Sequence, residues 1–522
     1  MRTCLRSFLV LLILMLGAPA TALAHGALKS SVPASGAHLS VAPTELRLTF
    51  TEAVELTFTR LELLGPDSQA VALGPLGHYG DDGARRVVGS AIREPLVAGT
   101  YTVAWQIAGA DGHPVRGRFT FMLMPGATGL ADPMAGPPGE GVEAAASALP
   151  PAGGGARGVA PSGQTPPAAT HHDPTSLPDN PGFDAESPLY VAIRWATFSA
   201  ILIAIGAVAF HGFVLRLLRR TQAPGSPMLA PASVRAAGIG LWGAVALGVV
   251  ALLRLYAQSY ALQGREGALD PGMLAAILGR TVWGWGWLLQ VVGVALAGLG
   301  FLLARRGGRG GGRAGWGIAA LGVAALAFSP ALSGHAAAVP QLTWLAVLAD
   351  GVHVIGAGGW LGSLLLVVAV GLPAAHRLPE GERGWGAAEL INAFSPTALG
   401  FAGIVALTGV FSAWLHMDAV SALWRSGYGQ TLLLKLAILS VVAGTGAYNW
   451  LRVKPALGGV EGAIRIRRSA TLELAVGVLV LVVTAALVAT PTPMDMAMEG
   501  ATAASDGGSA VMPMVPVVPV AR

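Results

Sequence analysis

The sequence predicts an exported protein in two parts, an all-β domain of the Ig-like or Greek-key barrel type followed by an α-helical transmembrane bundle of about eight helices. Three observations predict this fold class. Residues 25–124 alternate apolar and polar side chains, which is typical of half-buried strands. Long apolar stretches follow residue 189. The whole chain is 53% hydrophobic and only 12% charged, which indicates several membrane spans.

Residues 1–24 predict a signal peptide. Two arginines form its basic start, residues 8–16 are apolar but too short to span a bilayer, and residues 22–24 have the small-x-small pattern of a signal peptidase site. We expect cleavage to leave His25 as the first residue of the mature chain, with a free amine and an imidazole on one residue. The alternative is that a histidine follows the cleavage site by chance.

The composition limits the chemistry that the mature chain can use. The only cysteine is Cys4, inside the predicted signal peptide, so a bound metal would have to use histidine, methionine, carboxylate or the N-terminal amine. The sequence has neither a G-x-x-x-x-G-K-[ST] phosphate loop nor a C-x-x-C-H haem attachment motif. The net charge is +5, but the arginines cluster between apolar stretches, which indicates membrane topology and not nucleic-acid binding. The lipid bilayer is the expected partner of these segments.

The strands of the β part are predicted by "ELRLTFTEAVELTFTRLELL", "GTYTVAWQIAG" and "GRFTFMLM", which are separated by Gly, Pro and Asp. About a hundred residues of this kind make a small sandwich or barrel. Residues 125–188 consist largely of Pro, Gly, Ala and Ser, which cannot form a core, so we expect a disordered linker. Residues 491–522 are expected to form a methionine-containing tail outside the cytoplasm.

The apolar stretches within residues 189–490 are each long enough to span a bilayer. The segments after the first, third, fifth and seventh stretches carry most of the arginines and lysines, which favours the cytoplasm for those segments. We therefore expect a multi-pass protein of the bacterial inner (plasma) membrane, with the β domain and the C-terminus on the extracytoplasmic side. The approximate spans are 189–215, 233–255, 282–304, 315–333, 343–371, 395–416, 430–451 and 469–489.

The motif "DGHPVRG" contains the candidate metal ligands of the β domain. Asp111 and His113 lie two residues apart, so on a strand or an extended turn their side chains project to the same side. Together with His25 they offer two imidazoles, one amine and one carboxylate, a set that suits tetragonal Cu(II). A turn that uses Asp-Gly-His-Pro without a metal is the alternative.

This part of the chain resembles the CopC family of periplasmic copper-binding domains, which are small Greek-key β-barrels. The resemblance covers about residues 25–124 and depends on His25, "LTFTEAVE" and "DGHPVRG". It implies Cu(II) bound by the amine and imidazole of His25, with Asp111 and His113 completing the site. Some relatives add a methionine-rich loop for Cu(I), whereas this domain has only two methionines, at its end.

The membrane part has its own candidate ligands. Asp350 and His353 lie three residues apart in "LADGVHVIGAGGWLG" and share a helix face, and His335 lies in "SGHAA" near the outer end of the preceding span. Counted from Gln341 at about 1.5 Å per residue, Asp350 and His353 lie roughly 13 Å and 18 Å along the helix. Ionisable groups at that depth are costly and favour a relay function, with a self-satisfied pair that packs the bundle as the alternative.

Further candidates lie around these residues. His416 follows the sixth span, where a solvated loop end explains it equally well, and His211 is expected to be an interfacial histidine. The linker histidines 171 and 172 are expected to be solvated. Charged residues within three spans could be counter-charges for one another: Arg194, Lys435 and Glu473. Alternating methionines in the tail offer soft ligands for Cu(I): Met494, Met496 and Met498.

The membrane part resembles the CopD family of copper-resistance and copper-uptake membrane proteins, which have about eight spans. The motifs are "SGHAA", "DGVHVIGAGGWLGSLLL", "FSPTALG" and "YGQTLLLKLAIL", followed by Asn449 and Glu473. The resemblance covers roughly residues 189–490. The whole chain thus resembles a CopC–CopD fusion, an arrangement also seen in the YcnJ-type copper importers.

We expect a copper-handling membrane protein without enzymatic activity. The β domain would capture Cu(II) outside the membrane and the bundle would pass copper inward, with copper resistance by periplasmic sequestration as the alternative. A copper-dependent oxidative enzyme and a haem-binding electron carrier that uses His335 and His353 are alternatives of another class. The expected partners are copper ions and periplasmic copper chaperones or a reductase. Capture of Cu(II) followed by soft Cu(I) sites would require a reduction step.

Overall fold

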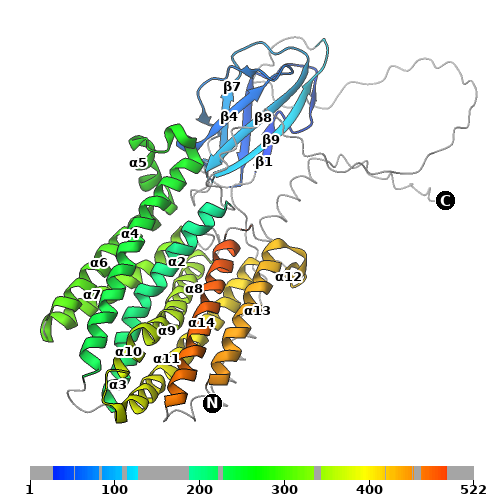
Figure 1. The fold of residues 1–522 in the computed structure, drawn as a ribbon. Helices are drawn as coiled ribbons and strands as arrows, with labels where there is room; N and C mark the ends of the chain where they lie inside the picture. Colours follow the sequence, from blue (N-terminus) through cyan, green and yellow to red (C-terminus); the bar gives the residue numbers. More distant parts are fainter. Residues whose placement is uncertain are drawn as a thin grey trace, which may run out of the picture.

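The computed structural model shows a β domain and a helical bundle that lies against one end of it (Figure 1). This architecture confirms the predicted fold class. The structure describes residues 28–51, 53–80, 85–108, 114–126, 187–221, 227–307, 309–333, 342–417, 419–449, 451, 460–488 and 490.

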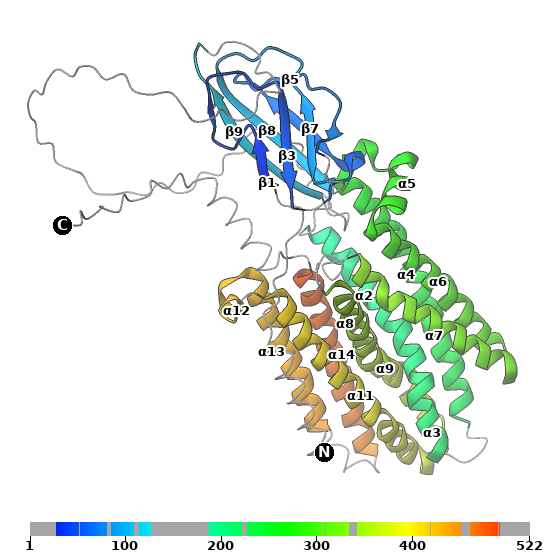
Figure 2. The ribbon, with the colours of Figure 1, turned by 180° about the vertical axis from the view of Figure 1, so that it is seen from behind.

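The β domain consists of two sheets. The strands are β1 Leu28–Val32, β2 His38–Leu39, β3 Glu45–Phe50, β4 Arg60–Leu64, β5 Ala70–Val71, β6 Gly77–His78, β7 Val87–Ala91, β8 Gly99–Ala108 and β9 Pro114–Leu123, and a short helical turn, η1, spans Leu56–Phe58. One sheet has the order β1-β3-β7-β6, and Figure 2 labels its strands β1, β3 and β7. The other sheet has the order β2-β9-β8-β4-β5. β2 pairs with β9 in parallel, and the other named pairs are antiparallel.

The alternation of β3, "ELRLTF", places every second side chain in the core. Leu46, Leu48 and Phe50 are buried, whereas the polar residues between them are half-buried. The ring of Phe50 lies edge-on to the ring of Trp105 on β8, with 5.1 Å between the ring centroids. Gly117 on β9 leaves room for the Trp105 ring, which occupies the place of a side chain there. Period-two patterning therefore builds this core as predicted.

The second half of β8 departs from simple alternation because both of its faces are buried. Tyr101, Val103 and Trp105 face the core of the β domain. On the opposite face, Gln106 donates a hydrogen bond to the helical bundle, and Ala108 belongs to an apolar cluster that includes bundle residues. The bundle therefore supplies burial that the pattern of the strand alone does not predict.

Among the described residues, eight helical runs are long enough and apolar enough to cross a membrane. Each overlaps one predicted span, which confirms the expected number. The elements are α2 Pro188–Ala209, η2 Phe210–Val214, α3 Leu215–Thr221, α4 Leu229–Gly267, α5 Pro271–Arg280, α6 Val282–Arg306, α7 Arg309–Leu332, α8 Thr343–Ala357, η4 Gly358–Gly362, α9 Ser363–Leu366, η5 Val367–Gly371, α10 Leu372–Ala375, α11 Glu380–His416, α12 Ala422–Arg425, α13 Gly427–Tyr448 and α14 Val460–Leu487.

The second span extends well past its predicted end. The apolar stretch 233–255 continues into a more polar section of α4, which is broken at Gly264 by φ 73° and ψ −174°. A second short helix, α5, then begins, because Asp270 accepts a hydrogen bond from the Met273 amide and Pro271 occupies the first position. These segments rise beside the β domain (Figure 2). Hydropathy did not predict this extension, since it lies beyond the apolar stretch.

The fifth span is not one regular helix. Two π-helical turns, η4 and η5, interrupt it after α8 and α9. Gly362 of η4 packs against Gly206 of α2, and a Cβ atom at either position would collide with the other backbone. Small residues allow such close approach between membrane helices. This contact fixes the run that begins with α8 against the first span.

Candidate functional site

Asp350, His353 and His416 are the candidate ligands that lie within the described part of the chain. Within that part, no group of three or more His, Cys, Asp or Glu side chains is arranged to hold a metal ion. The linker histidines 171 and 172 lie outside the described residues, and so do the remaining candidates: His25, Asp111, His113, His335, Met494, Met496 and Met498.

The described neighbours of the β-domain candidates lie at one end of that domain. Leu28 begins β1 and pairs with Phe50, whose ring contacts Trp105. Ala108 ends β8 and pairs with Pro114, the first residue of β9. Because Trp105 precedes Ala108 on the same strand, the start of β1 and the β8–β9 ends are neighbours. This end of the domain faces the bundle (Figure 1).

Asp350 and His353 lie on α8, one helical turn apart, and both are half-buried. Measured from Thr343, the first residue of α8, they lie about 10 Å and 15 Å along the helix axis at about 1.5 Å per residue. The two side chains therefore occupy successive depths in the bundle.

The ring of His353 has a defined hydrogen-bond partner on α11. Its Nδ1 lies 2.8 Å from the Thr408 hydroxyl, which donates its own proton to the Ile404 carbonyl at 2.7 Å. A hydroxyl has a single proton, so Nδ1–H is the donor toward Thr408. The ring also has a hydrogen-bond contact with the Val405 backbone. With the proton on Nδ1, the neutral ring carries its lone pair on Nε2. Metal-binding histidines have this arrangement, with one nitrogen donating to a fixed acceptor and the other available to the metal.

Lys435 on α13 acts electrostatically on both Asp350 and His353. The opposite charges of Lys435 and Asp350 lower the cost of placing either group among apolar helices. Lys435 was not predicted to be part of this site.

The predicted mutual pairing of the three intramembrane charges is wrong. Glu473 accepts a hydrogen bond from the Asn449 side-chain amide at 2.5 Å. The guanidinium carbon of Arg194 lies 4.4 Å from the centroid of the Tyr190 ring. Lys435 interacts with Asp350 on α8. The three charges therefore have partners other than one another, because the packing of the helices decides which side chains meet.

His416 ends α11 at the same end of the bundle where α8 begins. The start of α8 and the end of α11 share an apolar cluster that includes Ala346, Phe411 and Leu415. The Nδ1–H of His416 donates to the Ser412 carbonyl at 2.8 Å, because a carbonyl can only accept. His416 lies about 12 Å from the level of Thr408 along α11. We refer to His416, Asp350, Thr408 and His353 together as the α8–α11 seam.

Sequence reasoning missed a second polar group, centred on Arg254 of α4. This side chain is 7% exposed, and it donates to Gln290 Oε1 at 2.9 Å and to Ser333 Oγ at 2.5 Å. Its guanidinium carbon lies 5.2 Å from the centroid of the Trp283 ring. An arginine at the edge of a predicted span was the available signal, but such a position usually indicates a residue that reaches the interface.

His211 has structural partners. Its Nδ1 lies 2.9 Å from the Ser233 hydroxyl, and its ring stacks on Trp316 with 4.0 Å between centroids. The ring is therefore held inside the bundle between α4 and α7, which agrees with a packing role and not with a ligand role.

Three regions of the chain match known families. Residues 28–124 match the CopC domain, and residues 184–340 match the copper resistance protein D-like N-terminal domain. Residues 388–487 match copper resistance protein D. The matches cover the β domain and two parts of the bundle, and residues 341–387, which include α8, lie between them.

Similar proteins include both full-length and single-domain relatives. The copper transport protein CutJ of Bacillus subtilis (strain 168) is 25% identical over 501 residues, which cover 95% of this chain and 79% of CutJ. Copper resistance protein C of Pseudomonas syringae pv. tomato is 34% identical over 109 residues, which cover 20% of this chain and 84% of that protein.

A similar solved structure is that of PcoC, a methionine-rich copper resistance protein from Escherichia coli. Its sequence is 34% identical to this chain over the matched residues. The match covers 19% of this chain and 99% of the PcoC chain, and its TM-score is 0.17. Because the β domain matches copper resistance protein C and the bundle matches both parts of copper resistance protein D, this chain belongs to the family of CopC–CopD fusion proteins.

Proposed function

We propose that this protein captures copper with its β domain and imports it through the bundle along the α8–α11 seam. The observation that carries the proposal is the hydrogen bond from His353 Nδ1–H to Thr408, which leaves Nε2 as a metal-binding nitrogen within a membrane span. The alignment with the copper transport protein CutJ over 95% of this chain supports the same reading.

Cu(II) capture is assigned to His25, Asp111 and His113. An amine, two imidazoles and a carboxylate form a ligand set that suits Cu(II). The nearest described residues, Leu28 and Ala108, are neighbours at the end of the β domain that faces the bundle, which supports a shared site.

The membrane steps are assigned to side chains that follow one another in depth. His416 lies at the outer end of the α8–α11 seam, and Asp350 and His353 lie about 10 Å and 15 Å along α8. Imidazole nitrogen and carboxylate oxygen can replace part of the hydration shell of a cation, and Lys435 balances the carboxylate charge. His335 belongs to the segment between α7 and α8, and the tail offers Cu(I) ligands: Met494, Met496 and Met498.

The orientation that we propose places the β domain outside the cytoplasm. The arginines of α3 lie at the end of the bundle away from the β domain (Figure 1). Arg305, near the end of α6, has its guanidinium close to Gly238 on the first part of α4. Clusters of arginine favour the cytoplasmic side, so this end faces the cytoplasm of a bacterial inner (plasma) membrane, with the C-terminus on the opposite side.

The test is cell-associated copper, separated into cytoplasmic and periplasmic pools. Four strains are compared at matched expression: without the protein, with it, with His353→Ala, and with His376→Ala. His376 is a matched control because it lies exposed at the end of α10. We expect the cytoplasmic pool to rise with the protein and with His376→Ala, and to return to background with His353→Ala.

Other outcomes support other functions. A rise confined to the periplasm would indicate sequestration at the β domain, and a fall in the cytoplasmic pool would indicate efflux. No change in either pool would contradict transport. Oxygen-dependent peroxide formation or a haem absorption band in the purified protein would then support the oxidative enzyme or the electron carrier.

A further inference from the structure

The end of the β domain that faces the bundle is in direct contact with α4, α5 and α6. Phe58 of η1 is 1% exposed and Ala108 is 0% exposed, and neither belongs to the core cluster of the β domain. They share a separate buried cluster with helix residues: Ala251, Leu262, Ala276, Ile277, Trp283 and Trp287. The helices therefore bury the apolar residues at this end of the domain.

The β domain also hydrogen-bonds the end carbonyls of α4. The break at Gly264 removes the amide donors that a continuing helix would supply to the carbonyls just before it. Arg116 Nη2 donates to the Ala261 carbonyl and Gln106 Nε2 donates to the Leu262 carbonyl, both at 3.0 Å. The C-terminal end of a helix carries partial negative charge, which suits a guanidinium and an amide.

Arg60 extends this set of contacts by one residue. Its Nη2 donates to Gln263 Oε1 at 2.9 Å and also points to the Gln263 carbonyl at 3.4 Å. Arg116 Nε donates to Gln106 Oε1 at 2.9 Å, which connects two of the donors. Residues 261, 262 and 263 thus each bind a side chain of the β domain.

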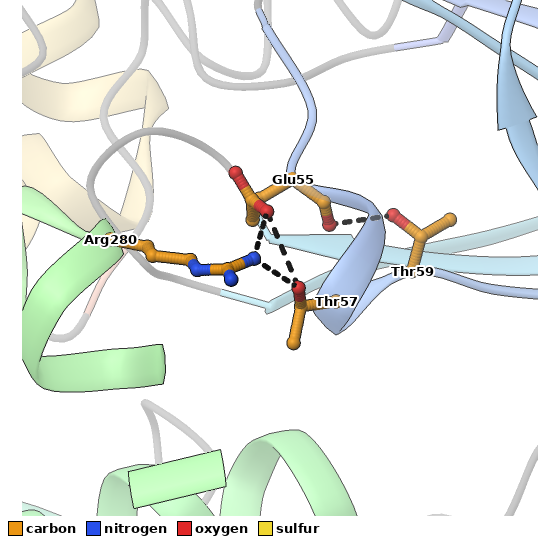
Figure 3. Close-up of polar contacts among 4 residues, drawn as sticks. All are labelled: Glu55, Thr57, Thr59 and Arg280. Carbon is orange, nitrogen blue, oxygen red and sulfur yellow. Dashed lines mark hydrogen bonds and ion pairs between the residues drawn. The ribbon is translucent and has the colours of Figure 1, made fainter. Parts of the chain in front are cut away.

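A second polar contact lies at the edge of the same surface, between η1 and the end of α5 (Figure 3). Arg280 Nη1 lies 3.2 Å from Glu55 Oε1 and donates to Thr57 Oγ1 at 3.0 Å. Thr59 Oγ1 donates to the Glu55 carbonyl at 3.0 Å, which ties the turn together. The turn that contains Phe58 is therefore stabilised both by its own hydrogen bond and by its contacts with Arg280.

We propose that the broken end of α4, α5 and the start of α6 form a built-in receptor for the β domain of the same chain, and that copper is delivered from the docked domain. We define the receptor as residues 261–263, Ile277, Arg280 and Trp283. The strand ends next to the proposed Cu(II) ligands belong to the docked surface, since Ala108 is part of it. The docking part of this proposal depends only on the contacts between the β domain and the helices. The copper-delivery part rests on the proposed function.

The receptor is in contact with the polar group centred on Arg254. Trp283 belongs to the docking cluster, and its ring lies 5.2 Å from the Arg254 guanidinium carbon. Arg254 in turn holds Ser333, two residues before His335. A docked β domain is thus connected through Trp283 and Arg254 to Ser333, just after α7, and a tether of about 60 residues keeps donor and receptor at high effective concentration.

Docking is tested by cross-linking in the full chain. Thr57→Cys and Gly279→Cys are introduced together with Cys4→Ser, and a bismaleimide is added to join the two new cysteines. Cleavage at a protease site inserted in the linker then separates the β domain from the bundle unless the two are cross-linked. Gly279 is suitable because a Cβ there meets open space. The control pair joins Thr57→Cys to Ser421→Cys, beside α12. We expect the first pair to cross-link and the control pair to remain separable. Equal yields from both pairs would overturn the receptor.

A receptor variant tests the delivery step. Gln263→Arg places a like charge against Arg60, and Glu266→Arg is the control because Glu266 is exposed and has no described contact with the β domain. We expect Gln263→Arg to lower both the cross-linking yield and copper uptake about fivefold, and Glu266→Arg to change neither. The β domain of both variants should still bind Cu(II), as measured by electron paramagnetic resonance.

The outcomes separate the two ideas. If Gln263→Arg reduces cross-linking while uptake is unchanged, delivery from the docked state is wrong. If the unmodified protein takes up no copper but gives selective cross-linking, the receptor stands and the proposed transport function fails.

Discussion

Two polar groups of the bundle, one buried and one half-buried, differ in how their hydrogen-bonding capacity is used. The guanidinium of Arg254 is held by Gln290, Ser333 and the face of Trp283. His353 has one ring nitrogen in a hydrogen bond with Thr408, and we propose that the other binds copper. A polar side chain whose partners come from the protein stabilises the fold, whereas one with a remaining ligand position can serve transport.

The largest expected effect is on stability, at Arg254. Arg254→Met removes two charge-assisted hydrogen bonds and leaves their buried acceptors unpaired, so the free energy of unfolding should fall by about 3 kcal/mol. Thermal unfolding in detergent measures this. Arg219→Met, at an exposed position of α3, is the control and should change stability by less than about 0.5 kcal/mol. Equal melting temperatures for the two variants would show that Arg254 is not a structural centre.

The second effect concerns Thr408, which orients His353. Thr408→Val removes the acceptor of Nδ1–H, so copper affinity of the bundle should fall about 10- to 100-fold, the range found for outer-shell partners of metal-binding histidines. Thr408→Ser keeps the hydroxyl and should retain affinity. Copper titration of the membrane part with the β-domain ligands removed measures both variants. Identical affinities for the valine and serine variants would contradict the proposed orientation.

A smaller effect is expected at Lys435, whose positive charge opposes a cation next to Asp350. Lys435→Gln should raise copper affinity about fivefold, which corresponds to about 1 kcal/mol of removed repulsion. Arg467→Gln, at an exposed position of α14, is the control. The same copper titration measures the affinities of both variants. Weaker copper binding by Lys435→Gln would mean that Lys435 stabilises the site and does not repel the ion.

The smallest effect concerns the Glu55–Arg280 ion pair at the rim of the receptor. Both side chains are partly exposed, so the pair should contribute only about 0.2–1 kcal/mol to docking. Arg280→Gln should therefore lower the cross-linking yield about twofold at low salt and less at high salt, because salt screens exposed charges. An effect that does not depend on salt would show that Arg280 acts by packing.

Much of the fold followed from local patterns. Period-two alternation predicted β3 and the long strands β8 and β9, and apolar length predicted the eight spans. The extension of α4 and the helix α5 were not predicted, because their stability comes from contact with the β domain and not from membrane burial. Phe58 likewise reads as a strand residue in "LTFTRLELL", and only the docked helices explain its burial.

The candidate site was predicted only in part, because the sequence does not show which helices are neighbours. Helical spacing places Asp350 and His353 on one face of α8, and burial cost indicates that they matter. The partners Thr408 and Lys435 come from α11 and α13, and helix spacing carries no information about which helices meet. Arg254 was missed because its acceptors lie 36 and 79 residues away in sequence.

Copper transport along the α8–α11 seam is tested most directly by copper entry into vesicles that contain the purified full-length protein and a lumenal copper-sensitive dye. Unmodified protein, His353→Ala and His376→Ala are compared at equal protein density, with Cu(II) and with ascorbate-reduced copper outside. We expect the unmodified protein and His376→Ala to fill the vesicles with copper, and His353→Ala to give copper entry no faster than protein-free vesicles. Entry through His353→Ala at the unmodified rate would contradict a path along the α8–α11 seam.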